Sequence, residues 1–113
     1  MITYYHNPRC RKSREALKLL EDKDEDVTII KYLQVPPTPQ KLTELIALLG
    51  IAPIELVRKN ESIWKDKFKG KDLTDAEVIN AMVEYPKLIE RPIAIKGQKA
   101  VVGRPPERVL EIL

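Results

Sequence analysis

The pattern of apolar and polar positions near the start of the chain predicts a strand, a helix and a second strand. Residues 2–5 (ITYY) are β-branched or aromatic and stop at His-Asn-Pro, as a short strand entering a loop does. From residue 11 to about residue 21, alanine and leucine side chains recur at helical spacing on one side of a charged face. Residues 27–33 (VTIIKYL) are typical of another strand. The three elements together predict a βαβ unit with two parallel strands.

The next apolar pattern is that of a helix with both of its ends marked. Four apolar side chains recur at positions i, i+3, i+4 and i+7, and these are Leu42, Leu45, Ile46 and Leu49. Thr38 can cap the helix, Pro39 suits its first turn, and Gly50 suits its end. We therefore expect a helix over residues 39–49.

Helical signals continue to about residue 90. Residues 53–60 are expected to form another helical segment, whereas residues 63–68 are ambiguous. Thr74 and Glu77 have the spacing of a capping box before a further helix. We therefore interpret residues 36–90 as a mostly helical insert.

The last part of the chain returns to strands. Residues 93–96 and 99–102 flank Gly97-Gln98, which predicts a hairpin, and GRPPERVLEIL predicts a final helix starting near Pro105. The order is βαβ, then the helical insert, then ββα. That order predicts an α/β fold, a thioredoxin-like sandwich, in a single domain over residues 1–113.

Composition narrows the class of protein further. With 113 residues, 43% of them hydrophobic and 33% charged, the chain has the size and balance of one globular domain. The net charge of +3 is too small to indicate a nucleic-acid partner. No leader is recognisable and no apolar run approaches the length of a membrane span, so we expect a cytoplasmic protein without a membrane partner. One cysteine and one histidine provide too few ligands for a usual structural metal site, and no metal is expected.

The only cysteine, Cys10, lies where positive charge is concentrated. Residues 1–20 hold five basic side chains and a single acidic one. Cys10 also directly precedes the predicted helix, whose amide N–H groups and dipole favour a thiolate. Ser13 could donate a hydroxyl hydrogen bond to the sulfur, and His6 could orient it or pair with its charge. The same features suit a tetrahedral oxyanion.

Other interpretations of these residues stay open from the residues alone. A lone cysteine is often a small buried apolar side chain. The basic residues Arg11, Lys12 and Arg14 could simply form a solvated helix face. Trp64 and Phe68, four residues apart, suit the core of the helical insert better than a binding surface.

Four segments resemble the arsenate reductases that couple to glutathione and glutaredoxin. In order along the chain they are YHNPRCRKSR around Cys10, LVRKN at residues 56–60, LIERPI at residues 88–93 and GRPPE at residues 103–107. The resemblance implies that Cys10 is the catalytic nucleophile, and its loop also carries His6 and Asn7. We expect His6 and Ser13 to assist catalysis and Asn7 to help bind the substrate. The resemblance further implies that the arsenic oxyanion is bound by Arg58, Arg91 and Arg104. Pro92 falls where thioredoxin-like folds keep a cis proline.

The chain differs at two places from the families that it resembles. Arg11 and Lys12 follow the cysteine, where family members usually have small residues. Related thiol-stress regulators, which bind RNA polymerase, carry a second cysteine at the position of Ser13. With that position a serine, the regulators' internal redox switch is missing.

The resemblance implies reduction of arsenate to arsenite through a covalent cysteine–arsenate intermediate. Because the chain has one cysteine, no internal disulfide can resolve that intermediate, and glutathione is expected as co-substrate with glutaredoxin as partner. No bound cofactor is expected. Two alternatives remain: a glutaredoxin-like deglutathionylase, and a non-catalytic module that acts on transcription through its basic first helix.

Overall fold

The computed structural model describes all residues from Met1 to Leu113 and divides into two compact units. The first unit joins Met1–Val35 to Arg91–Leu113, and the second is Pro36–Glu90. The second unit spans the residues expected to form the helical insert. None of the helices has both the length and the apolar character that crossing a bilayer requires.

A sheet of four short strands organises the first unit. Its strands are β1 (Ile2–Tyr5), β2 (Val27–Ile30), β3 (Ile93–Lys96) and β4 (Lys99–Val102), in the order β2-β1-β3-β4. β1 and β2 are parallel and are connected through helix α1 (Arg11–Glu21), which confirms the predicted βαβ unit. β3 and β4 form the predicted antiparallel hairpin, with Gly97 at a φ of 61° in its two-residue turn.

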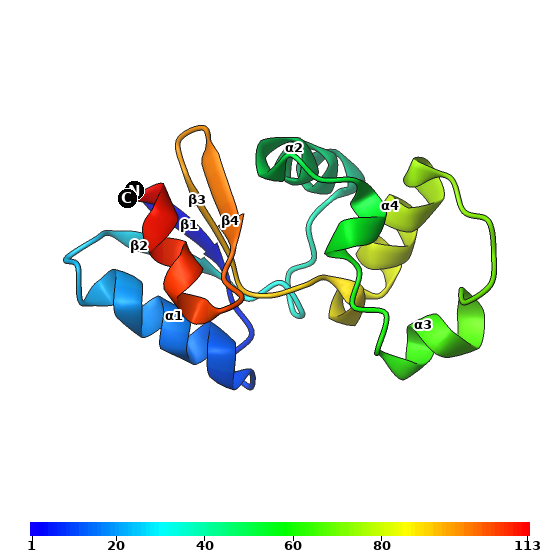
Figure 1. The fold of residues 1–113 in the computed structure, drawn as a ribbon, viewed down its shortest axis with the longest axis horizontal. Helices are drawn as coiled ribbons and strands as arrows, with labels where there is room; N and C mark the ends of the chain where they lie inside the picture. Colours follow the sequence, from blue (N-terminus) through cyan, green and yellow to red (C-terminus); the bar gives the residue numbers. More distant parts are fainter. The chain divides into compact units, whose positions relative to one another are not determined.

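One face of this sheet forms the core of the first unit. Tyr4, Ala94 and Val101 are cross-strand neighbours on this face, and all three are buried. Apolar side chains of α1 and of the 3-10 helix η3 (Pro106–Ile112) pack in the same cluster. Figure 1 shows α1 and η3 side by side along the sheet. This packing fixes the N-terminus of α1 close to the end of β1, where Cys10 lies.

The second unit consists of helices. They are α2 (Pro39–Leu49), η1 (Pro53–Leu56), α3 (Ser62–Lys67), α4 (Asp75–Glu84) and η2 (Pro86–Leu88). The predicted ends of α2 are confirmed, since the Thr38 side chain accepts a hydrogen bond from the Lys41 amide and Gly50 is left-handed. The capping box of Thr74 and Glu77 is also present. Trp64 stacks on Phe68 and is buried, which agrees with a core role.

Three predicted elements differ from the observed ones. β2 ends at Ile30 rather than at residue 33, because the Lys31 carbonyl accepts hydrogen bonds from both Gln34 and Val35 and the chain turns there. The helical segment predicted for residues 53–60 ends at Leu56, since Val57 pairs with Ile89 in an isolated β-bridge. The final helix has 3-10 rather than α geometry. The ambiguous residues 63–68 largely belong to α3.

Candidate active site around Cys10

The loop that carries Cys10 is built by local backbone hydrogen bonds. It leaves β1 at His6, whose amide donates to the Ile30 carbonyl at 2.9 Å and so ties the loop to the end of β2. The Asn7 side-chain oxygen accepts from the Arg9 amide at 3.0 Å, and the Asn7 carbonyl accepts from the Cys10 amide at 2.9 Å. Both oxygens of Asn7 therefore hold the turn that brings Cys10 to the start of α1.

Cys10 is the N-cap residue of α1 and is neither buried nor fully exposed. Its partial burial acts to raise the pKa of the thiol. The Ser13 amide, the Arg91 guanidinium and the Lys12 amide act in the opposite direction, and the pKa lies below its ordinary value. The Cys10 side chain makes no capping hydrogen bond to α1. The predicted environment for a reactive thiol is therefore present.

The Ser13 side chain does not play the part expected for it. Its hydroxyl, fully buried, lies 2.7 Å from Nδ1 of His6 and accepts a hydrogen bond from the Asn7 amide at 3.1 Å. It is the backbone N–H of Ser13 that favours the Cys10 thiolate. The hydroxyl connects α1 to the loop, because its partners are two loop residues that precede Cys10.

The hydrogen-bond partner of the His6 ring is the Ser13 hydroxyl and not a carboxylate. Burial and the positive charges of Lys31 and Arg14 lower the pKa of His6, against a weaker opposite effect of Glu21. The His6 ring lies beside the Tyr4 ring, with 5.6 Å between their centroids. Tyr4, which the sequence analysis did not single out, donates its hydroxyl to the Ser13 carbonyl, and burial raises its pKa. His6 and Tyr4 thus both secure the first turn of α1.

Two of the three predicted anion-binding arginines belong to the same unit as Cys10. Arg91 acts directly on the thiol through its guanidinium, and its Nε atom is buried without a hydrogen-bond partner. Arg104 donates from Nε to the Arg91 carbonyl at 2.8 Å. The peptide bond between Arg91 and Pro92 is cis, as expected, and the bond between Arg104 and Pro105 is also cis.

The third predicted arginine, Arg58, belongs to the second unit. Its amide donates to the Leu88 carbonyl at 2.7 Å. Its guanidinium is bound by two carboxylates, Glu61 at 3.1 Å and Glu90 at 3.2 Å. The spacing of three residues could have indicated Glu61, whereas nothing in the sequence indicated Glu90. A ligand anion at Arg58 would have to compete with these two carboxylates.

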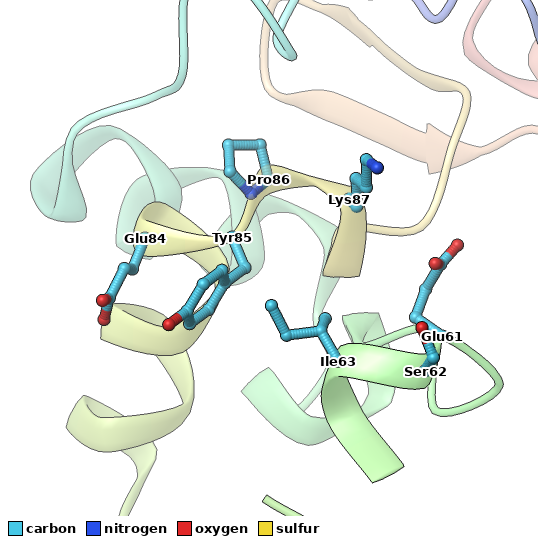
Figure 2. Close-up of a pocket in the computed structure, with 7 residues that line it drawn as sticks. All are labelled: Glu61, Ser62, Ile63, Glu84, Tyr85, Pro86 and Lys87. Carbon is cyan, nitrogen blue, oxygen red and sulfur yellow. The ribbon is translucent and has the colours of Figure 1, made fainter. Parts of the chain in front are cut away.

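A hollow in the second unit has different chemistry. It has a volume of about 390 Å³ and is lined by residues of α3, of the end of α4 and of η2. Figure 2 shows the Tyr85 ring and the Ile63 side chain facing one another, with Glu61 and Glu84 at opposite ends. Its two carboxylates outnumber its one cation, Lys87, which disfavours an oxyanion, and no nucleophilic thiol lines this hollow. The loop around Cys10 is therefore the better candidate for an active site.

The arrangement around Cys10 suits nucleophilic attack on an anion. A thiol with a lowered pKa lies at a helix N-terminus, and a buried guanidinium nitrogen beside it has no partner within the protein. Helix N-termini and guanidinium groups both bind tetrahedral oxyanions. The site can therefore hold a nucleophile and an electrophilic oxyanion together.

Comparison with known proteins gives relatives along the whole chain. The sequence profile described as the ArsC family matches residues 5–112. A Haemophilus influenzae protein named arsenate reductase is 44% identical over 114 residues, which cover 99% of this chain and 98% of that protein. An Escherichia coli K12 protein named uncharacterized protein YfgD is 42% identical over 114 residues, covering 99% of this chain and 96% of the other.

Solved structures extend the similarity to the fold. A structure described as arsenate reductase from Vibrio cholerae superposes with a TM-score of 0.95 at 44% identity, over 99% of this chain and 97% of that one. This agreement confirms the predicted α/β, thioredoxin-like fold class.

Proposed function

The chain belongs to the ArsC family, and from that premise we propose that it is an oxidoreductase that reduces arsenate to arsenite. The observation that carries the proposal is the pairing of Cys10, whose pKa is lowered, with Arg91, whose buried Nε has no partner in the protein. The first group supplies a thiolate, and the second supplies a donor for an oxyanion oxygen. Relatives named arsenate reductases supply the choice of oxyanion.

In the proposed first step, the Cys10 thiolate attacks arsenic(V). A sulfur–arsenic bond forms, and one arsenate oxygen leaves as water after protonation. Arg91 donates hydrogen bonds to the remaining oxygens, and the amide N–H groups of Ser13 and Lys12 favour the deprotonated form of Cys10 before the attack. Arsenic stays in oxidation state five throughout this step.

In the second step, an external thiol completes the reduction. The thiolate of glutathione attacks the Cys10 sulfur, the sulfur–sulfur bond forms, and the sulfur–arsenic bond breaks with its electron pair left on arsenic. Arsenic is thereby reduced to arsenic(III), and the two sulfurs are oxidised to a mixed disulfide. A glutaredoxin thiol then attacks the glutathione sulfur and frees the Cys10 thiolate. Glutathione is assigned here because Cys10 is the only cysteine within these 113 residues.

Arg104 and Arg58 have indirect support as anion ligands. Arg104 holds the main chain of Arg91 by its hydrogen bond to the Arg91 carbonyl. Arg58 enters the proposal through the family resemblance of the LVRKN segment. For Arg58 to bind arsenate, the oxyanion must replace at least one of its carboxylate partners, Glu61 and Glu90.

Intact-protein mass spectrometry after a single turnover tests the proposal. With arsenate and glutathione, the protein should carry one glutathione on Cys10 and release arsenite, and further turnover should require glutaredoxin with its reductant. Cys10→Ser should give neither product, because an unassisted serine hydroxyl is a poor nucleophile.

Two other results would favour the other functions considered for this chain. Removal of glutathione from a mixed disulfide without arsenate reduction would identify a deglutathionylase. If the protein catalyses neither reaction but binds RNA polymerase, and if that binding depends on Arg11, Lys12 and Arg14, the protein would be identified as a transcription module. Each result would overturn the proposed arsenate reduction.

A further inference from the structure

A cavity in the first unit lies directly beside the Cys10 loop. It has a volume of about 440 Å³ and is lined by the loop residues from His6 to Arg9 and by residues of the turn after β2. The steps proposed above use none of the cavity's side chains on that turn. The backbone brings Cys10 close to it, since the Cys10 amide is 2.9 Å from the carbonyl oxygen of Asn7, a lining residue.

The cavity is positively charged, and its charges are not neutralised by the protein. Arg9 and Lys31 line it, no acidic side chain does, and neither cation forms an ion pair. Elsewhere in the first unit, Arg11, Lys18 and Lys96 are each paired with a carboxylate. Two cations left without partners at one cavity favour an anionic ligand.

The uncharged groups of the cavity suit a peptide. Asn7 is buried and its side-chain oxygen is occupied by the Arg9 amide, which fixes the amide group and leaves its NH₂ as a donor. Gln34 adds a second side-chain amide, and Leu33 adds an apolar wall. Amide groups can donate to and accept from the peptide bonds of a ligand. A bare inorganic anion would use the cations and leave the amides and the leucine without a role.

We propose that this cavity binds glutathione, with its carboxylates at Arg9 and Lys31 and its peptide groups at Asn7 and Gln34. The inference rests on the proposed function, because it concerns the thiol that resolves the Cys10 adduct. Glutathione has two carboxylates for the two cations. A tripeptide spans about 10 Å when extended, which is long enough for its central thiol to reach the neighbouring Cys10 while its ends stay in the cavity.

Binding can be measured without any turnover by use of S-methylglutathione, whose sulfur cannot react. His6 lines the cavity and can report on it by NMR, because its pKa is lowered first by burial and then by the positive charges of Lys31 and Arg14, while Glu21 acts to raise it. A carboxylate bound at Lys31 offsets part of that positive charge. We therefore expect saturable binding that raises the pKa of His6.

Variants that remove a positive charge test whether S-methylglutathione binds in this cavity. Arg9→Gln and Lys31→Gln should each weaken binding of S-methylglutathione by about threefold or more, and the double variant by about tenfold. Lys23→Gln removes another exposed cation, one that does not line the cavity, and it should bind as the wild type does. In arsenate reduction, the cavity variants should raise KM for glutathione and leave KM for arsenate unchanged.

The outcomes separate this inference from the proposed function. Absence of binding, or equal binding by the wild type and the double variant, overturns the glutathione site even if arsenate is reduced. Displacement of the ligand by inorganic phosphate at equal concentration also overturns it, since the cavity would then recognise simple anions. Localised binding in a protein that does not reduce arsenate supports the glutathione site and overturns only the arsenate reduction.

Discussion

The Nε atom of Arg104 donates a hydrogen bond to the backbone carbonyl of Arg91 at 2.8 Å, so that one arginine of the first unit secures the main chain of another. The Arg91 side chain in turn acts on the Cys10 thiol. A chain of three residues thus connects the GRPPE segment to the nucleophile. Because these segments are far apart in the sequence, the fold is what brings them together.

Replacing Arg91 by lysine should impair arsenate turnover although the charge is kept. An ammonium group is a compact point charge and cannot reproduce the planar fork of donors that a guanidinium offers to an oxyanion. We expect kcat/KM for arsenate to fall by about tenfold or more, which corresponds to the loss of one charge-assisted hydrogen bond. Arg108→Lys is the matched control, because Arg108 is exposed and paired with Glu111. Equal losses in both variants would remove Arg91 from the proposed site.

Replacing Ser13 by alanine should loosen the loop without changing the acidity of Cys10. The hydroxyl bonds His6 and the Asn7 amide, while the thiolate is favoured by the Ser13 backbone N–H, which alanine retains. Leaving buried partners unsatisfied should lower the free energy of unfolding by about 1–3 kcal/mol. Urea unfolding measures the loss, and alkylation against pH measures the Cys10 pKa. A raised Cys10 pKa in this variant would show that the hydroxyl does serve the sulfur.

The sequence predicted the elements whose ends depend on local chemistry. The helix over residues 39–49 was predictable because Thr38 caps it and Gly50 ends it, and both signals lie within the segment. The end of β2 was not predictable, because the turn depends on the Lys31 carbonyl accepting hydrogen bonds from two backbone amides. No residue in VTIIKYL marks that turn, since all of its side chains suit a strand.

The same distinction holds for the candidate site. The position of Cys10 at the start of α1 followed from local patterns, and that of Arg91 and Arg104 followed from family resemblance. The partners of the Ser13 hydroxyl could not be predicted from either source, because the serine faces back across the loop toward His6 and Asn7. The carboxylate Glu90 beside Arg58 was also missed, since the two come together only through pairing of the segments around Val57 and Ile89.

Replacing Gly103 by alanine should destabilise the first unit. A Cβ atom at this position would lie 2.8 Å from Cγ of Pro92 and 2.8 Å from Cγ1 of Val109, both inside normal contact distance. Overpacking of this kind costs about 1–3 kcal/mol, which urea unfolding can measure. The loss should be smaller when Gly103→Ala is introduced together with Val109→Ala, because one of the two clashing atoms is then absent. Identical losses in the two backgrounds would show that the clash with Val109 is not the cause.

The protein should lose stability as the pH falls below the ordinary histidine pKa of 6.5. The pKa of His6 is lowered in the folded protein, so between the folded pKa and 6.5 the unfolded chain binds more protons. The contribution of His6 to the free energy of unfolding is therefore fully present above pH 6.5, and it declines as the pH is lowered toward the folded pKa. His6→Gln, which does not titrate, should show a weaker decline in urea unfolding between pH 7.5 and pH 5. If the free energy of unfolding declined equally in the wild type and in His6→Gln, the pH dependence would come from other titratable groups.

Cys10 should react as a thiolate at a lower pH than free cysteine, and Arg91 should be part of the reason. Partial burial acts to raise its pKa, but backbone N–H groups and the Arg91 guanidinium together outweigh that effect, and the pKa is lowered. The rate of alkylation by iodoacetamide should therefore rise and level off at lower pH than for a cysteine peptide.

Arg91→Met keeps an unbranched side chain, like the aliphatic part of arginine, and removes the charge. It should therefore move the alkylation profile of Cys10 toward higher pH. Arg108→Met, which removes an exposed and paired arginine, should leave the profile in place. An uncharged reagent is needed, because a charged one would respond to the lost arginine through its own attraction to the site. If Arg91→Met and the wild type gave one and the same profile, the helix N-terminus alone would account for the acidity of Cys10, and Arg91 would keep only its proposed contact with the oxyanion.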